Sequence, residues 1–521
     1  MPMKFACWRR PVALAALTVT AVQSVLADVR LHPLFSDHAV MQRGQPVPVW
    51  GWADPGEAVS VEFAGQKVAA QADEQGRWRA TLKALAPSAT GATLRVTGKN
   101  VVERQDILVG EVWICSGQSN MEWPMSRSEN PEADIQNSAH PNLRLFTVLK
   151  HRSRIPLSNF ADPSKHAWQA SGPDTVRSFS AVAYYFGRAL VAARQTPVGL
   201  VHVSWGGSPA EVWMSHDVLS NTHVYARDIL NPSVQAWGNH VKSVRQWEQE
   251  KAAAERDGKP FTKGRPGQPW TPSELYHGML HPLLPYAMRG AIWYQGESNA
   301  GRAWQYRSLF ADMIRNWRRD WGQGDFPFLA VQLAPWDKNK KRSLSEITAT
   351  PVESDWAELR EAQNYVAEVL PKVGIAVITD VGDKDDIHPT KKQPVGERLA
   401  LLARRIAHGE RVAAQGPVLA SAREDKGRVI LKFDEAAGGL KTSDGAALTG
   451  FAVAGPDRVW RWAKAEIEKG DRVVVSSPEV SFPVAVRYGW ADFPVVNLVN
   501  GAGLPASPFR TDNFPVTTAK K

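Results

Sequence analysis

The sequence predicts an α/β protein with a central parallel β-sheet covered by helices and a β domain on either side. Between residues 106 and 410, apolar runs alternate with stretches that carry apolar residues at three- and four-residue spacing, as buried strands and amphipathic helices do. Residues 28–105 and 411–521 instead contain short alternating runs separated by turn residues. Repeated alternation of strand and helix favours a parallel sheet with helices on both faces.

The first 27 residues are typical of an export signal. Lys4, Arg9 and Arg10 precede a mostly apolar segment, and small or medium-sized residues end it at Ala27, so we expect cleavage before Asp28. An anchoring helix is the alternative, although the apolar run is short for a membrane span. The mature chain is therefore expected to be soluble, periplasmic or secreted, and free of membrane contact.

Composition and charge exclude some classes of protein. The content of hydrophobic residues (43%) and charged residues (22%) is typical of a globular chain. The formal net charge is +9, but the basic residues are scattered among 53 acidic ones and form no stripe or nucleic-acid recognition motif. An anionic substrate is compatible with this charge. Cys7 would leave with the signal, so Cys115 would be the one cysteine of the mature chain and could form no intramolecular disulfide. We expect it to be a buried thiol.

The two flanking segments each predict a β domain of short strands. Segment 28–105 is expected to form a small β-sandwich, and segment 411–521 a second β domain, because apolar and polar residues alternate between turns in both. The predicted strands are 47–52, 59–63, 76–82, 428–433, 472–476 and 484–490.

The central segment, 106–410, predicts alternating strands and helices. The predicted strands are 107–114, 143–149, 198–204, 290–294, 326–333 and 373–379, and the predicted helices are 181–194, 303–321, 356–370 and 395–406. Residues 214–274 are polar and variable, with a plausible helix over 241–256 and then a Gly/Pro/Lys stretch. We expect this segment to be an excursion over the rim of the ligand-binding crevice, or a mobile lid.

Polar clusters follow four of the predicted strands, at the edge where open α/β sheets bind ligands. The first holds Ser119, which Gly117 lets project from a tight turn. The second cluster could instead be an ordinary strand-to-helix turn, and the third could serve to cap a helix. The clusters are 117–120 (GQSN), 204–208 (SWGGS), 294–299 (YQGESN) and 380–389 (DVGDKDDIHP).

A serine and a histidine from two of these clusters predict nucleophilic catalysis. Serine needs a base, an orienter for that base and donors for the oxyanion. His388 follows the last strand and is crowded by carboxylates that can fix its tautomer. Ser119 as nucleophile, His388 as general acid–base and an Asp would form a triad, with the N–H groups of Ser119 and Gly207 in the oxyanion hole. The acidic loop does not complete a calcium-binding pattern, so no metal is predicted.

The clusters carry a resemblance to the sialate O-acetylesterase family, within the broader SGNH hydrolases. That resemblance implies an SGNH-type, flavodoxin-like three-layer α/β/α domain that removes O-acetyl groups from sugars without a metal or organic cofactor. The matching segments are 117–121 (GQSNM), 205–211 (WGGSPAE), 293–299 (WYQGESN), 386–389 (DIHP), 276–283 and 488–512.

The resemblance also suggests the remaining site residues. The SGNH pattern has an Asp three residues before the histidine, which favours Asp385, whereas many bacterial relatives keep an acid two before it, which points to Asp386. The third oxyanion donor is expected to be Gln295, with Asn299 as the alternative. Indole rings stack on sugar faces, so we expect substrate contacts from the residues that adjoin the clusters: Trp123, Trp205, Gln118, Asn120 and Glu297.

These observations predict an exported carbohydrate O-acetylesterase whose partner is an acetylated carbohydrate. Sialic acid carries a carboxylate, which is compatible with the net positive charge of the chain. Plant-wall xylan or xyloglucan esters suit an exported enzyme equally. Two other hypotheses stay open: a glycosidase with paired carboxylates, such as Glu297 with Asp383, and a non-catalytic glycan-binding protein. The sequence predicts neither the acetyl position nor the oligomeric state.

Overall fold

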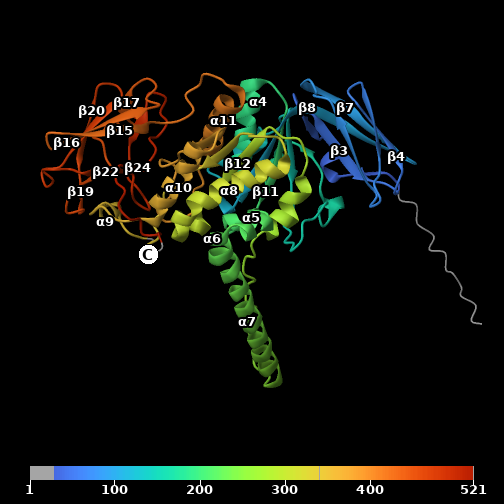
Figure 1. Cartoon of the computed structure of the whole chain (residues 1–521), viewed down its shortest axis with the longest axis horizontal. Coiled ribbons are helices and arrows are strands. Elements are labelled where there is room, and N and C mark those ends of the chain that lie inside the picture. Colours follow the sequence, from blue (N-terminus) through green and yellow to red (C-terminus); the bar gives the residue numbers. More distant parts are fainter. Residues whose placement is uncertain (1–27, 340, 520–521) are drawn as a thin grey trace, which may run out of the picture.

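The computed structural model describes residues 28–339 and 341–519, and the predicted export signal lies outside them. In Figure 1, the amino-terminal β region (blue) and the carboxyl-terminal β region (red) lie on opposite sides of a central body that combines strands with helices. No helix among the described residues has the length and apolarity needed to cross a membrane.

The amino-terminal region is built from short strands, as predicted, and all of its pairings are antiparallel except that of β2 with β8. One sheet has the order β1-β3-β6, and β4 pairs with β5 and β7. The strands are β1 (Arg30–Leu31), β2 (Val40–Gln42), β3 (Val47–Trp52), β4 (Ala58–Phe63), β5 (Gln66–Gln71), β6 (Arg77–Leu82) and β7 (Ser88–Thr97).

One strand, β8 (Val101–Gly117), belongs to both this region and the central sheet. It pairs with β7 in its first half and with strands of the central sheet in its second half. The backbone bends at Asp106, which has a φ of 56°, and the β7–β8 register shifts on either side of Ala92. The boundary placed between residues 105 and 106 therefore falls at a bulge inside a continuous strand, and the two regions share this strand.

The central sheet has the order β10-β9-β11-β8-β12-β13-β14. Its neighbours are parallel except for β10, which is antiparallel to β9. With β9 and β10 set aside, the remaining order β11-β8-β12-β13-β14 matches the 2-1-3-4-5 order of flavodoxin-like folds, consistent with an SGNH-type domain. The strands, each within a predicted range or equal to it apart from β10, are β9 (Leu143–Thr147), β10 (Gln169–Ala170), β11 (Val198–Ser204), β12 (Gly290–Tyr294), β13 (Phe328–Val331) and β14 (Val373–Ala376).

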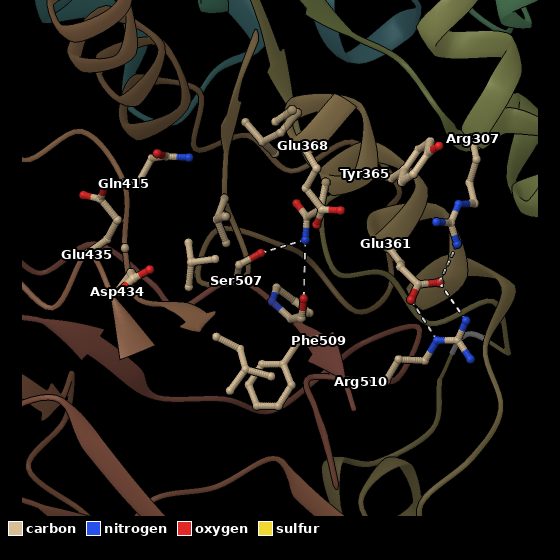
Figure 2. Close-up of a pocket in the computed structure, with 18 residues that line it drawn as sticks. Arg307, Glu361, Tyr365, Glu368, Gln415, Asp434, Glu435, Ser507, Phe509 and Arg510 are labelled. Carbon is tan, nitrogen blue, oxygen red and sulfur yellow. Dashed lines mark hydrogen bonds and ion pairs between the residues drawn. The ribbon is translucent and has the colours of Figure 1, made fainter. Parts of the chain in front are cut away.

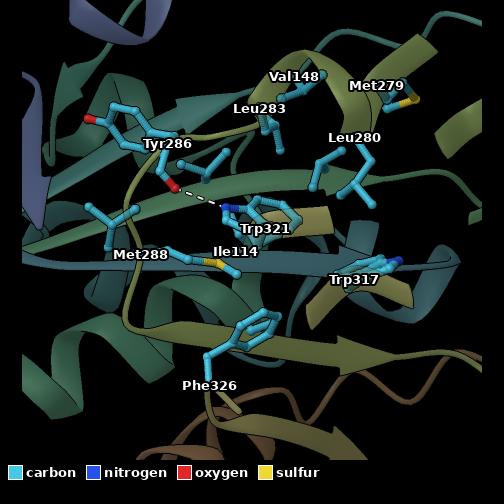
Figure 3. Close-up of a cluster of buried hydrophobic side chains, with 14 of the residues drawn as sticks. Ile114, Val148, Met279, Leu280, Leu283, Tyr286, Met288, Trp317, Trp321 and Phe326 are labelled. Carbon is cyan, nitrogen blue, oxygen red and sulfur yellow. Dashed lines mark hydrogen bonds between the residues drawn. The ribbon is translucent and has the colours of Figure 1, made fainter. Parts of the chain in front are cut away.

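Helices cover both faces of this sheet because its strands are apolar on both sides. In β8, Val112 and Ile114 pack into the cluster that contains α8 and α10, whereas Trp113 and Cys115 pack into the cluster that contains α4 and α11. Figure 3 shows part of the first cluster, where Trp321 donates a hydrogen bond to the carbonyl of Tyr286. The long covering helices are α4 (Ala181–Arg194), α8 (Ala303–Trp321), α10 (Asp355–Val369) and α11 (Gln393–His408).

The 214–274 excursion forms a helical arm. Its helices are α5 (His216–Asn221), α6 (His223–Tyr225) and α7 (Asn231–Arg256), and α7 projects away from the body in Figure 1. No residue of α7 is buried. The returning chain packs along it, since Trp247 donates a hydrogen bond to the carbonyl of Lys263 at 2.7 Å. The helix begins ten residues earlier than predicted. The prediction missed its first turns because they carry no apolar face that packs on the body.

The carboxyl-terminal region consists of short strands, as predicted. The structure pairs them in antiparallel fashion around a separate apolar cluster. Its sheets have the orders β15-β16-β21-β20, β19-β18-β22-β24 and β17-β23. The strands are β15 (Val418–Asp425), β16 (Arg428–Asp434), β17 (Leu440–Thr442), β18 (Phe451–Ala454), β19 (Trp460–Trp462), β20 (Lys464–Glu468), β21 (Arg472–Ser476), β22 (Ala485–Tyr488), β23 (Leu498–Asn500) and β24 (Phe509–Arg510).

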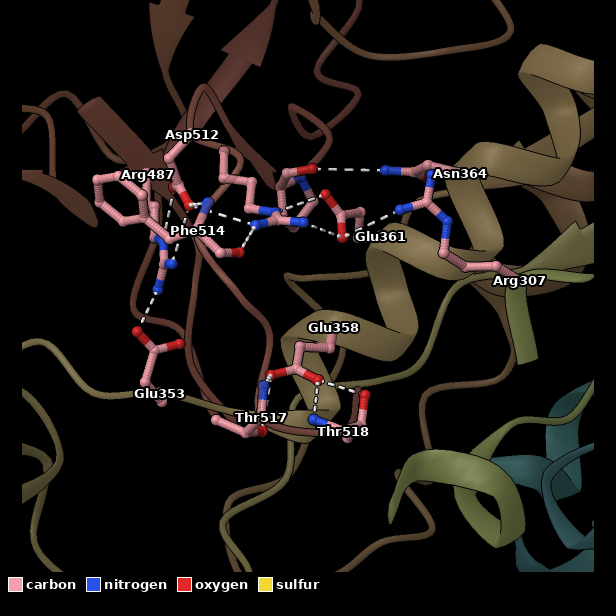
Figure 4. Close-up of polar contacts among 12 residues, drawn as sticks. Arg307, Glu353, Glu358, Glu361, Asn364, Arg487, Asp512, Phe514, Thr517 and Thr518 are labelled. Carbon is pink, nitrogen blue, oxygen red and sulfur yellow. Dashed lines mark hydrogen bonds and ion pairs between the residues drawn. The ribbon is translucent and has the colours of Figure 1, made fainter. Parts of the chain in front are cut away.

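Helix α10 fastens the carboxyl-terminal region to the central domain, as Figure 4 shows. Arg510 contacts Glu361 at 2.8 Å, and the two carboxylate oxygens of Glu358 accept hydrogen bonds from Thr517 and Thr518. The short helices that complete the described chain are α1 (Ser119–Glu122), α2 (Pro131–Gln136), α3 (Pro173–Val176) and α9 (Leu344–Ile347).

We expect Arg360→Met to destabilise the protein by about 2–4 kcal/mol. Arg360 is fully buried in α10, and its guanidinium donates hydrogen bonds to the carbonyls of Leu333, Ala334, Ala491 and Asp492. The variant leaves these buried carbonyls without that donor. The measurement is the midpoint of urea unfolding, compared with Arg411→Met at an exposed position. Equal midpoints for the two variants would contradict this account.

Candidate active site

The turn after β8 holds Ser119 at the carboxyl edge of the sheet. Gly117 has a φ of 143°, and a Cβ added there would lie 2.1 Å from the carbonyl oxygen of Tyr294 on β12, so only glycine fits. The N–H of Gln118 donates to the same carbonyl at 3.0 Å. Ser119 then begins α1, half-buried, with its side chain directed to the cavity described below.

His388 meets Ser119, as the sequence predicts. Its Nε2 lies 2.9 Å from the Ser119 Oγ, although the two residues are 269 positions apart. The imidazole stacks on the indole of Trp123, with ring centroids 5.3 Å apart and an interplanar angle of 17°. A histidine in this position can take the hydroxyl proton of the serine, because a general base must lie within hydrogen-bond reach of that proton.

The carboxylate beside His388 belongs to Asp386, so the preference for Asp385 is wrong. Asp386 Oδ1 lies 3.4 Å from His388 Nδ1 and accepts the backbone N–H of His388 at 2.8 Å. Asp385 instead accepts the N–H of Lys341 at 3.0 Å and contacts Lys384 at 2.5 Å. The cause is a turn around Asp383, whose Oδ1 accepts the N–H groups of both Asp385 and Asp386 and so directs their side chains to different partners.

The backbone N–H groups of Ser119 and Gly207 are the predicted oxyanion donors. Among the described residues, neither the Ser119 N–H nor the Gly207 N–H has a hydrogen-bond partner. The loop after β11 lies against the nucleophile, since a Cβ added to Gly206 would be 3.2 Å from the Ser119 Cβ. The N–H of Gly206 is already used: it donates to Glu122 Oε2 at 2.6 Å, and this bond braces the loop.

Gln295 and Asn299 do not supply the third oxyanion donor, which corrects both expectations. Gln295 is fully buried, and its Nε2 donates to Asn299 Oδ1 at 2.6 Å and to the Ser208 carbonyl at 3.3 Å. Asn299 is also buried and its Nδ2 donates to Glu211 at 3.0 Å. Both amides therefore stabilise the second cluster from behind and do not face the serine.

A cavity of about 780 Å³ opens at Ser119 and His388. Trp123 lines it, as expected of a substrate-contact residue. Trp205 stands nearby, half-buried, and its ring is 5.5 Å from the centroid of Trp270. Neither Trp205 nor the other expected contacts line the cavity. The side chains of Gln118 and Asn120 are buried, and Glu297 contacts Asn120.

The structure adds cavity residues that sequence reasoning missed. His202 and Ser204 lie on β11, and His202 Nε2 is 2.6 Å from Ser204 Oγ. Burial lowers the pKa of His202 to about 4, so its ring stays neutral near neutral pH. Two cations also line the cavity: Arg127, whose guanidinium lies 4.1 Å from the centroid of Trp123, and Lys150, which pairs with Glu122. His202 and Ser204 are polar residues at alternate positions of a buried strand, and this pattern is the sequence signal that could have identified them.

The paired carboxylates proposed for a glycosidase do not flank this cavity. Glu297 is turned toward Asn120, which donates to its Oε1 at 2.7 Å, and Asp383 is used inside the acidic loop. Neither residue lines the cavity. Of the other acids in that loop, Asp380 contacts Arg398 at 2.6 Å. Within residues 28–339 and 341–519, no group of three or more His, Cys, Asp or Glu side chains could hold a metal ion.

A second cavity, of about 440 Å³, lies between α10 and the carboxyl-terminal β region. Figure 2 shows Tyr365 and Glu361 from α10 facing Phe509 and Arg510 from β24. None of the residues predicted from the sequence for catalysis or substrate contact lines this cavity, so the chemistry belongs to the cavity at Ser119.

Comparisons with known proteins identify the family of the chain. The family described as "Carbohydrate esterase, sialic acid-specific acetylesterase" matches residues 109–257 and 263–403. The sialate O-acetylesterase of Rattus norvegicus is 29% identical over 453 residues, covering 78% of this chain and 80% of that protein. The human sialate O-acetylesterase is 28% identical over 401 residues, covering 71% of this chain and 69% of its own.

A solved structure is similar across nearly the whole chain. The crystal structure of a carbohydrate acetylesterase from Xanthomonas citri superposes with a TM-score of 0.79 at 38% identity, covering 93% of this chain and all 100% of that one. The matched family segments contain Ser119, the second and third clusters, Asp386 and His388. The chain therefore belongs to the carbohydrate esterase family of sialic acid-specific acetylesterases, and it is a carboxylic ester hydrolase.

Proposed function

We propose that the protein is an exported carbohydrate O-acetylesterase that works through an acetyl-enzyme on Ser119. The observation that carries this proposal is the 2.9 Å contact between Ser119 Oγ and His388 Nε2 at a cavity whose wall contains Trp123. An indole beside the reacting serine suits a sugar ring. The family to which the chain belongs supports the reaction class, and the contact between Ser119 and His388 supports the choice of residues.

In the first half of the reaction, Ser119 Oγ attacks the acetyl carbonyl carbon while His388 Nε2 takes its proton. The N–H groups of Ser119 and Gly207 stabilise the negative oxygen of the tetrahedral intermediate. Asp386 holds His388 through Nδ1 and favours the imidazolium that forms. When the intermediate collapses, the bond to the sugar oxygen breaks, and His388 returns the proton to that oxygen.

In the second half, water attacks the acetyl-enzyme with His388 again as the base. The tetrahedral intermediate expels Ser119 Oγ, which regains its proton from His388, and acetate leaves. No step uses a metal or an organic cofactor in this scheme. The position of Asp386, 3.4 Å from the ring, is compatible with a hydrogen bond that tightens when substrate excludes water.

Among acetylated sugars, we favour sialic acid. Arg127 lines the cavity and has no ion-pair partner among the described residues, so it is available to a sugar carboxylate. The names of the mammalian relatives point the same way. Acetylated xylan or xyloglucan fragments are the second candidate, because Trp123 can stack on a neutral sugar equally well.

The test compares acetate release from an O-acetylated sialoside, acetylated xylan and acetylated xyloglucan fragments. We expect the sialoside to give the highest kcat/KM and no substrate to release reducing sugar. Release of reducing sugar would favour the glycosidase hypothesis, and glycan binding without acetate release would favour a binding protein. Export is tested separately: the protein recovered from the periplasm or medium should begin at Asp28.

The activity should fall on the acid side at a pH below the ordinary value for histidine. Burial lowers the pKa of His388 from 6.5, opposed by Asp386 and reinforced by Lys392 and Arg127. The ring must be neutral to act as a base, and it is neutral above its pKa, so kcat/KM should be lost only as the pH drops through this lowered value. The pH profile of kcat/KM measures it, and an acid limb above pH 6.5 would contradict this assignment.

A further inference from the structure

A lysine lies buried directly behind the catalytic residues. Lys392 is only 1% exposed and follows His388 at the start of α11. Lysine is almost never fully buried unless it is paired, yet Lys392 has no ion pair within 4.0 Å among the described residues. Its Nζ instead donates to the amide oxygen of Asn120 at 2.5 Å and lies 5.5 Å from the ring centroids of Trp123 and Tyr294.

Asn120 joins three segments of the site. It follows Ser119 in the chain and is fully buried. Its Nδ2 donates to the carbonyl of Ile387, the residue before His388, at 3.1 Å, and to Glu297 Oε1 at 2.7 Å. Because the ammonium of Lys392 can only donate, it fixes which end of the amide faces it. The NH₂ group is thereby directed at the histidine loop and the third cluster.

Burial shifts the pKa values of the two ionisable side chains that contact Asn120, Glu297 and Lys392. The second carboxylate oxygen of Glu297, Oε2, is buried without a hydrogen-bond partner among the described residues. Burial raises the pKa of Glu297 and lowers that of Lys392 to about 7, with each charge partly offsetting the effect on the other. The charged groups that act on Lys392 are Glu297 and Asp386, and those that act on His388 are Asp386, Lys392 and Arg127.

We propose that Lys392 is a positioning residue for hydrolysis: through Asn120 it clamps the Ser119 turn to the His388 loop and keeps a positive charge close behind the imidazole. The proposal rests on the esterase function above. The clamp acts on geometry, because the hydrogen bond from Asn120 to the carbonyl of Ile387 helps to set the 2.9 Å contact between Ser119 and His388. The charge acts on the base below about pH 7, where Lys392 is mostly protonated and His388 titrates, because a nearby cation disfavours the protonated ring.

The test is Lys392→Met, with Lys391→Met as the matched control, since Lys391 is the exposed neighbour. In Lys392→Met we expect kcat to fall by about 10- to 100-fold with little change in KM. The acid limb of the kcat/KM profile should also move to higher pH, because the protonated imidazole loses a repelling charge. Lys391→Met should leave both quantities unchanged. Lys392→Arg, which keeps a cation, should keep the acid limb near its original pH.

Two results would overturn the proposal. One is a folded Lys392→Met variant with the original kcat and acid limb. The other is a variant that only unfolds more easily, with kcat per folded molecule and the acid limb both unchanged, because that is a purely structural role. If Lys392→Met does not fold, Asn120→Ala decides: it cuts the same link but keeps the charge, so kcat should fall while the acid limb stays, and an unchanged kcat refutes the clamp.

Failure of this inference can be told apart from failure of the proposed function. Undiminished turnover in Ser119→Ala would refute the nucleophile and with it the esterase mechanism. Normal turnover in Lys392→Met and Asn120→Ala, together with an inactive Ser119→Ala, would refute only the clamp.

Discussion

Replacing Ser119 by Ala is expected to lower kcat for an aryl acetate by a factor of about 10⁴ or more. The variant removes the atom that forms the acetyl-enzyme, and His388 then has only water to activate. Cys115 cannot substitute, because it is fully buried in β8 and burial raises its pKa well above the ordinary value for a thiol. The measurement is steady-state turnover of the aryl acetate at pH 7–8, with acetate release from the sialoside as a second assay.

The control for this variant is Ser178→Ala. Ser178 lines the same cavity and is exposed, so its loss should leave kcat close to that of the unmodified enzyme. The Ser119→Ala variant should also unfold at the same urea concentration, because Ser119 Oγ is half-buried and its hydrogen-bond partner is His388. Unchanged turnover in Ser119→Ala would reject the assignment of the nucleophile.

The second large effect separates two neighbouring acids. Asp386→Asn is expected to lower kcat by about 10²–10⁴, because the imidazole loses the carboxylate that orients it and stabilises its charged form. The effect should lie at the lower end, since the Asp386 side chain is 59% exposed and 3.4 Å from Nδ1. Asp385→Asn is the matched control, because Asp385 contacts Lys384 and the Lys341 N–H.

The pair of variants is measured under the same conditions as Ser119→Ala, with kcat and KM reported separately. We expect KM to change little in either, because neither acid lines the cavity. A larger loss of kcat in Asp385→Asn than in Asp386→Asn would show that the loop rearranges when substrate binds.

The strands and helices of the central domain could be predicted because their signals are local. The run Val198–Ser204 and the periodic segment Ala303–Trp321 become β11 and α8 with the predicted bounds. The signals failed where structure depends on distant partners. β8 extends back to Val101 because β7 pairs with it. The start of α7 at Asn231 was missed for a different reason: none of its residues is buried, so its first turns show no apolar face.

The same division holds for the site. Ser119 and His388 could be predicted, because each follows a buried strand of one sheet. The choice between Asp385 and Asp386 could not, because it depends on the turn around Asp383. Gln295 was chosen for its place at a strand end, but its side chain is held in a buried network that no local pattern shows.

The burial of Lys392 could not be predicted from the sequence. In the sequence it is half of a Lys-Lys pair at the start of a helix, where solvent exposure is the ordinary expectation. Only the three-dimensional structure reveals that one lysine is exposed and the other is buried against Asn120.

Covalent labelling can show directly whether Ser119 is the residue that carries the acetyl group. The enzyme is treated with an organophosphate, its residual activity is followed, and the labelled peptide is identified by mass spectrometry. The account predicts loss of activity in step with a single adduct on Ser119, and much slower labelling in His388→Ala. An enzyme that releases acetate while Ser119 stays unlabelled, or that is inactivated by an adduct elsewhere, would contradict it.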